Sequence, residues 1–196
     1  MKKTLFFIIP FIIMNACTTV PVRNIWKDEM YRGSPFAKVL VIGIDPQNQG
    51  SGQSTKIFFE DEFAKHLIDQ GVDAMKSDTI FSEDNVLEKR VITSKVKEMN
   101  IDAIVIISIR NVEETGTRTY PNVSTDEGFY GYYLQCCYQV SSGYNILIET
   151  RVYDGKYDTL IWRGAVVTVF SPGTFQQDTK QYFQDIITHL KADKLI

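Results

Sequence analysis

Hydrophobic and polar positions along the chain change between two periods, which predicts strands and helices in turn. Residues 38–44 (KVLVIGI) form a short apolar run, typical of a strand buried on both faces. The next apolar positions follow a helical spacing: Ile57, Phe59, Phe63, Ala64, Leu67 and Ile68. This spacing predicts a helix that starts at Ser54 or Thr55, runs to about Gln70 and ends with Gly71 in the left-handed conformation.

The same unit then occurs a second time. Residues 72–80 predict a strand, 85–99 a helix and 101–109 the most apolar strand, which we expect at the centre of the sheet. Residues 71–74 (GVDA) and 100–103 (NIDA) share one design: a helix cap, a β-branched residue, Asp and Ala. Two crossovers of the same design favour a β-α-β-α-β unit with parallel, right-handed connections.

The second half of the chain predicts an antiparallel extension of that sheet. Residues 144–153 alternate and turn back at 154–155, and residues 160–170 return as a strand. In the expected register Glu149 faces Arg163. A helix follows, with apolar residues Phe175, Tyr182, Phe183, Ile186, Ile187 and Leu190 and an end near Lys191. The predicted fold class is therefore α/β (α+β): a mixed sheet of about five strands in the order β-α-β-α-β-(flap)-β-β-α, with helices packed on the sheet.

The flap is the Tyr- and Gly-rich insert at 111–143. Segments of this length inside a compact domain are usually functional or disordered. Tyr, Gly, Ser and Asn make adaptable contact surfaces, so Tyr130, Tyr132 and Tyr133 are candidate partner contacts. The alternative is that these tyrosines only cover a sheet edge, and a third interpretation is stacking on a sugar.

The first seventeen residues predict an export signal with a lipid anchor. Lys2 and Lys3 precede an apolar run over 5–14, and Ala16 stands before Cys17. This layout resembles the lipobox of bacterial lipoproteins, which implies cleavage before Cys17 and acylation there. The alternatives are an ordinary signal peptide or a short membrane anchor, but the run is far shorter than the ~20 apolar residues that span a bilayer.

These features divide the chain into a signal peptide (1–16), a tether (17–35) and a single domain (36–196). Trp26 and Tyr31 are predicted to dock the tether to the domain. Because no Asp follows Cys17, the lipobox resemblance implies an outer-membrane anchor that faces the periplasm. The mature chain would carry 19 basic and 24 acidic residues, since Lys2 and Lys3 are removed, for a net charge of 19 − 24 = −5. This charge argues against nucleic-acid binding.

The sequence contains no G-x-S-x-G, H-E-x-x-H or C-x-x-C motif. The loop over 50–55 lies between a predicted strand and helix, but Gln53 stands where a phosphate-binding loop needs Lys. His66 and His189 lie in different predicted helices, and Asp73 and Asp102 are better suited to local hydrogen bonds than to catalysis. We therefore predict no enzyme, no cofactor and no metal.

The adjacent pair Cys136 and Cys137 lies in the flap. In an oxidising periplasm it can close a vicinal disulfide, which we favour over two free thiols. A soft-metal site is the least favoured of the three, because the sequence offers no companion ligands nearby.

Several segments together carry a family resemblance. After the lipobox come KVLVIGI, FEDEFAKHLIDQGVDA, NIDAIVIISI, the Tyr- and Gly-rich insert, ILIETRVYD and LIWRG. In this order they resemble small bacterial envelope lipoproteins and are similar to the N-terminal domain type of TolB and of the curli-secretion lipoprotein CsgG. The resemblance implies an assembly or accessory role and transfers no active site. The membrane-spanning hairpins of CsgG have no counterpart here, which argues against a pore.

The sequence thus predicts a non-enzymatic lipoprotein, anchored to the membrane through acylated Cys17, that binds a protein partner in the cell envelope. The alternative is a ligand-binding module for peptidoglycan, glycan or lipid. Whether the protein forms a homo-oligomer is left open.

Overall fold

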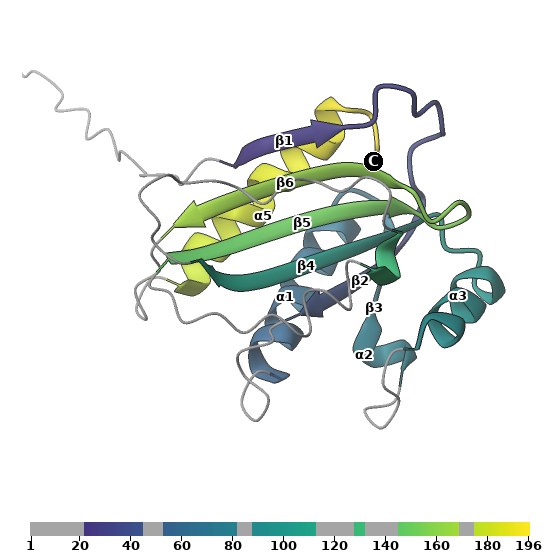
Figure 1. Cartoon of the computed structure of the whole chain (residues 1–196), viewed down its shortest axis with the longest axis horizontal. Coiled ribbons are helices and arrows are strands. Elements are labelled where there is room, and N and C mark those ends of the chain that lie inside the picture. The colour runs from purple at the N-terminus through teal and green to yellow at the C-terminus, as the bar shows by residue number, and fades with distance from the viewer. Residues whose placement is uncertain (1–21, 45–52, 82–87, 113–127, 132–144, 169–174) are drawn as a thin grey trace, which may run out of the picture.

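The computed structural model describes residues 22–44, 53–81, 88–112, 128–131, 145–168 and 175–196. The strands are β1 (Arg23–Lys27), β2 (Lys38–Ile44), β3 (Asp73–Lys76), β4 (Ala103–Val112), β5 (Asn145–Asp154) and β6 (Leu160–Thr168). The helices with assigned bounds are α1 (Gln53–Ile68), α2 (Ser77–Ile80), α3 (Lys89–Glu98) and α5 (Phe175–Ala192) (Figure 1).

The strands form one mixed sheet in the order β1-β6-β5-β4-β2-β3. β2 pairs in parallel with both β3 and β4, as the repeated crossover design predicts. The rest of the sheet is antiparallel, from β4 through β5 and β6 to β1. The α+β class and the mixed sheet are confirmed, and β4 is an interior strand.

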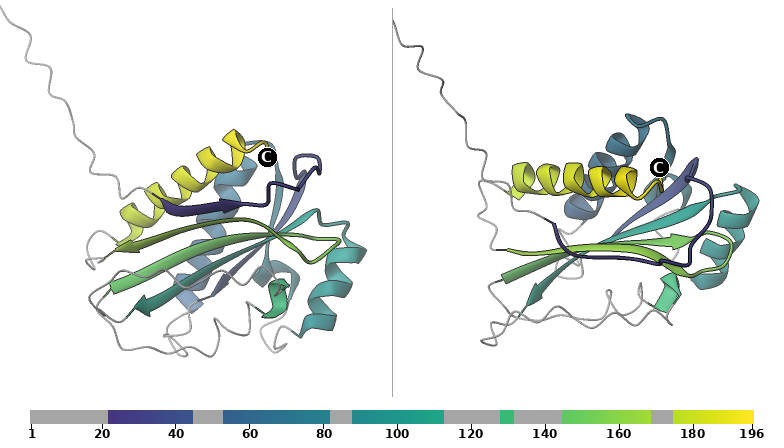
Figure 2. Two further views of the ribbon diagram at one scale, coloured as in Figure 1. Left: turned by 45° about the horizontal axis from the view of Figure 1, so that its top comes forward. Right: turned by 90° about the horizontal axis from the view of Figure 1, so that it is seen from above.

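Each face of the sheet has its own core. α1 and α5 cover one face, where Phe59, Phe63 and Phe183 pack on Val41 and Val105. α3 and the helical turn at 129–131 lie by the opposite face (Figure 2), and their side chains pack on the sheet in the second core. This second core includes the buried residues Leu40, Ile42, Ile92, Val96, Ile104 and Phe129. Burial on both faces explains why 38–44 is an unbroken apolar run.

Part of the predicted tether belongs to the sheet. Residues 23–27 form β1, which pairs antiparallel with β6, so the sheet has six strands and not about five. The strand lacks a strong apolar alternation because it lies at the sheet edge and is mostly exposed. Trp26 and Tyr31 pack against the two cores, which confirms their predicted docking.

Two further local predictions are wrong. The strand expected over 72–80 is shorter, because β3 ends at Lys76 and α2 follows. Ile68, assigned to the apolar face of α1, is 55% exposed, because it lies in the last turn of α1, away from both cores.

The register of the β5–β6 hairpin also differs from expectation. Glu149 lies opposite Ala165, and Arg163 lies opposite Arg151, because the turn is longer than expected and a bulge follows Val152. The shift amounts to two residues, so Glu149 and Arg163 still share a face. Arg163 Nε donates to Glu149 Oε1 across the diagonal, which preserves the predicted pairing in a buried setting.

No helix among the described residues is long and apolar enough to cross a membrane.

Candidate functional site

A hollow of about 630 Å³ opens at the amino end of the parallel strands β2 and β4. Its walls come from the loop between β1 and β2, the end of α3, the start of β4 and the β5–β6 turn. Apolar side chains of Phe36, Val96 and Ile101 line it together with the aromatic rings of Tyr31 and Tyr157. We call this feature the amino-end hollow. Its size and its mixed lining are typical of small-ligand sites.

Two carboxylates are held in fixed orientations in this hollow. Asp102 Oδ2 accepts hydrogen bonds from the backbone N–H groups of Ala37 and Lys38, both at 2.9 Å. Asp154 Oδ1 accepts from the backbone N–H groups of Lys156 at 2.8 Å and Tyr157 at 2.7 Å. Within the described part of the chain, the second oxygen of each carboxylate has no hydrogen-bond donor. Each group therefore keeps an acceptor for a ligand and loses little freedom when it binds.

The turn that carries Asp154 is tied directly to the start of β4. Gly155 N–H donates to the carbonyl of Asp102 at 2.7 Å. A Cβ at Gly155 would lie 2.3 Å from the carbonyl oxygen of Ile101, so only glycine permits this close approach. The contact sets the spacing between the two carboxylates.

The two tyrosines of the hollow differ in how they are held. The Tyr31 ring packs on Phe36, with 5.9 Å between ring centroids. Burial raises the pKa of Tyr31, and the negative charges of Asp154 and Asp102 raise it further, so its hydroxyl remains a donor at neutral pH. Tyr157 is 67% exposed, and the Lys156 ammonium lies 4.9 Å from its ring centroid. This geometry fits a cation–π contact at the rim.

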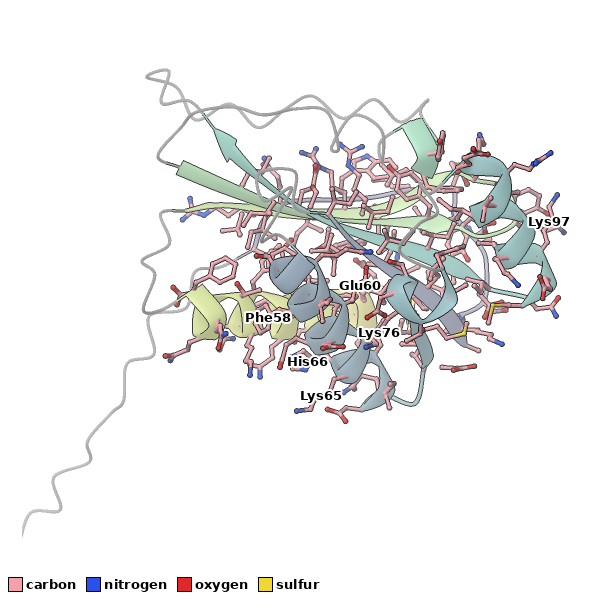
Figure 3. All side chains as sticks on the ribbon, turned by 90° about the horizontal axis from the view of Figure 1, so that it is seen from below. Phe58, Glu60, Lys65, His66, Lys76 and Lys97 are labelled. Atoms are coloured by element: carbon pink, nitrogen blue, oxygen red, sulfur yellow. The ribbon has the colours of Figure 1, made fainter. Side chains whose placement is uncertain are left out.

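The opposite end of β2 also has a carboxylate, but it is closed to solvent. Glu60 on α1 is fully buried (Figure 3). Its Oε1 accepts from Gly43 N–H at 2.9 Å and Ser77 Oγ at 2.6 Å, and its Oε2 accepts from Asp78 N–H at 3.2 Å. Burial raises the pKa of Glu60, and these hydrogen bonds oppose the shift. Glu60 thus joins α1, β2 and α2, which is a structural role.

The two aspartates considered in the sequence, Asp73 and Asp102, both contact the start of β2, and one of them also lines the hollow. Asp73 begins β3 and Asp102 directly precedes β4, and these two strands lie on either side of β2. Asp102 bonds to the β2 backbone, and Asp73 lies 3.7 Å from the Lys38 ammonium. The expected local hydrogen bonds are therefore wrong, since the partners lie on the neighbouring strand. Only Asp102 lines the hollow.

Most of the other predicted site residues lie outside the described residues: Cys17, Tyr132, Tyr133, Cys136 and Cys137. Tyr130 is described. It is half-buried and packs against the second core, with its ring 6.3 Å from that of Phe129. The backbone N–H of Phe129 donates to Asp158 Oδ1 at 2.7 Å, which fixes this turn to the β5–β6 turn.

The two histidines lie on α1 and α5. His66 is half-buried, and burial lowers its pKa. Among the described residues, no group of three or more His, Cys, Asp or Glu side chains is placed to hold a metal ion.

Sequence reasoning missed the amino-end hollow as a site. Tyr31 was expected only to dock the tether, while Lys97, Lys156 and Tyr157 carried no motif. The one available signal was the NIDA segment, which places an Asp directly before an apolar strand.

No protein-family model and no curated protein matches the sequence. Several solved structures show distant likenesses. The PelC dodecamer from Paraburkholderia phytofirmans is 8% identical, with 84% of this chain and 93% of that chain covered and a TM-score of 0.47. Lipoprotein GNA1162 from Neisseria meningitidis is 13% identical, with 82% and 99% covered and a TM-score of 0.39. A PDZ domain protein from Parabacteroides distasonis is 10% identical, with 79% and 31% covered and a TM-score of 0.38. At these identities and scores the likenesses assign neither a family nor a function, and the resemblance to the TolB and CsgG domain type stays a prediction.

Proposed function

We propose that this protein is a non-enzymatic binding protein of the cell envelope, anchored through acylated Cys17, and that the amino-end hollow is its ligand site. The anchor and the location rest on the signal and lipobox pattern of residues 1–17. The binding role rests on one structural observation. The hollow combines an apolar floor, two tyrosine rings and two carboxylates that each keep a free acceptor oxygen.

The geometry favours a ligand over a flat protein contact. A volume of about 630 Å³ suits a molecule of a few sugar or amino-acid units. Such a ligand can stack on Tyr157 and hydrogen-bond to Asp102 and Asp154. The predicted protein partner at Tyr130, Tyr132 and Tyr133 gains no comparable support, since Tyr130 is half-buried against the second core.

Binding can be tested with fragments of envelope polymers. We expect a peptidoglycan digest to change the intrinsic fluorescence of the purified, acylated protein in a saturable way. The Tyr157→Ser variant should bind at least about tenfold more weakly, because an exposed aromatic anchor of the site is lost. Fluorescence titration, repeated by isothermal calorimetry, measures both proteins.

Met30→Ser is the matched control for that experiment. Met30 is 80% exposed and does not line the hollow, so its variant should bind like the wild type. Equal binding by Tyr157→Ser and wild type would show that the hollow is not the binding site. A flat titration with every fragment would contradict the binding function itself.

A further inference from the structure

The amino-end hollow contains charged groups of both signs. Its lining residues include Asp102 and Asp154, which are acidic, and Lys97 and Lys156, which are basic. None of these four groups forms an ion pair with another described residue. Tyr157 raises the pKa of Lys156 and Asp154 raises it further at longer range, but no direct ion pair joins the two positive and two negative groups of the hollow.

Elsewhere on the described surface, several lysines form ion pairs with carboxylates. Lys76 lies 2.6 Å from Asp61, and Lys180 lies 3.2 Å from Glu62. Even in the β5–β6 turn, Asp158 pairs with Lys89 at 3.2 Å. The charged groups of the hollow thus lack the direct ion pairs that these three lysines form.

Local contacts keep these charges apart. Backbone N–H groups hold one oxygen of each carboxylate, as described above. Lys156 is engaged with the face of Tyr157, and Lys97 projects into solvent from the last turn of α3 (Figure 3). A ligand that carries both signs can join the two sets without first breaking an ion pair within the protein.

We infer that the ligand of the amino-end hollow is zwitterionic: a short peptide, or a fragment that carries one, with a free ammonium group and a free carboxylate. This inference rests on the proposed binding function. The ammonium group binds Asp102 and Asp154, and the carboxylate binds Lys97 and Lys156. Phe36 and Ile101 receive an apolar side chain. A neutral sugar can hydrogen-bond to these groups but forms no ion pair with them, and a phosphate anion can form ion pairs only with the two lysines.

Calorimetry with blocked peptides tests the inference. The probes for the full acylated protein in detergent are alanyl-phenylalanyl-alanine with free ends, its N-acetyl form, its C-terminal amide and neutral chitotriose. We expect N-acetylation and amidation each to weaken binding about tenfold or more, because each removes a charge-assisted contact. Added salt should weaken the free tripeptide and leave chitotriose unaffected.

Two variants locate the charges on the protein. Asp102→Asn keeps an oxygen for the N–H groups of Ala37 and Lys38 but loses the negative charge, so it should bind the free tripeptide about tenfold more weakly. The Asp102→Asn variant should bind the N-acetyl form with the same affinity as the wild type does. Asp73→Asn is the matched control, since Asp73 occupies the same position of the repeated motif outside the hollow. For the carboxylate of the ligand, the corresponding variant is Lys97→Met and its control is Lys65→Met.

The outcomes separate the two proposals. Tight binding of chitotriose with no effect of peptide blocking would overturn the zwitterionic ligand and leave the binding function standing. Loss of binding in Asp102→Asn with no difference between free and acetylated peptide would also overturn it. No binding of any probe, together with a flat titration by the peptidoglycan digest, would overturn both.

Discussion

The two ends of β2 each have carboxylates, but these groups differ in their hydrogen bonds. At the carboxyl end, Glu60 is fully buried and both of its oxygens accept hydrogen bonds. At the amino end, Asp102 and Asp154 each keep one oxygen without a described donor. All three carboxylates accept from backbone N–H groups of a neighbouring element or turn. The difference lies in how many acceptor positions remain and whether solvent reaches them. A satisfied, buried carboxylate stabilises the fold, while a fixed and half-satisfied one is available to a ligand.

Removing the buried carboxylate should produce the largest effect on stability. We expect Glu60→Ala to lower the free energy of unfolding by about 3 kcal/mol, because it leaves the donors of Gly43, Ser77 and Asp78 without their acceptor. Urea denaturation followed by circular dichroism measures this change. Tyr157→Ser, at the other end of the sheet, should stay within about 0.5 kcal/mol of wild type. Similar losses in the two variants would contradict the division between a structural end and a binding end.

A smaller effect should appear in the pH dependence of stability. Because burial raises the pKa of Glu60, the folded state holds its proton more tightly than the unfolded state. The stability that Glu60 contributes is therefore complete below the ordinary glutamate pKa, about 4.3, and is lost as the pH rises through the raised pKa.

Glu60→Gln removes this titration, so its free energy of unfolding should fall less than that of wild type as the pH rises over this window. At low pH the variant should be less stable by about 1 kcal/mol, since one hydrogen bond is impaired. Urea midpoints measured across the window give both profiles. Parallel profiles would show that Glu60 does not titrate in the folded state as proposed.

The elements that follow from local sequence were predictable. The apolar run of β2 is one example. The helix caps are another, because Gly71 and Asn100 both have the positive φ expected there, at 85° and 53°. β1 could not be found in this way, because an exposed edge strand has little apolar pattern. The hairpin register was also missed, because a bulge depends on cross-strand packing and not on the alternation of either strand.

The site was less predictable than the fold. In the sequence, Glu60 is followed by the polar residues of the helix pattern, and nothing there marks it as buried. Its burial follows from the close approach of α1 to Gly43. A Cβ at Gly43 would lie 2.8 Å from the Lys56 carbonyl oxygen. The hollow joins Tyr31, Lys97 and Tyr157, which lie far apart in the sequence. No periodicity or motif relates them, because the β2–β4 and β4–β5 pairings bring their segments together.

The most direct test of the binding end is to map amide shifts by NMR while the free tripeptide is added to isotopically labelled protein in detergent micelles. We predict saturable shifts at the amides of Asn100, Gly155 and Tyr157, with the amides of Gly43 and Ser77 unchanged. Shifts centred on Gly43 and Ser77 would contradict this prediction. Saturable shifts in another part of the protein, with both sets of amides unchanged, would also contradict it.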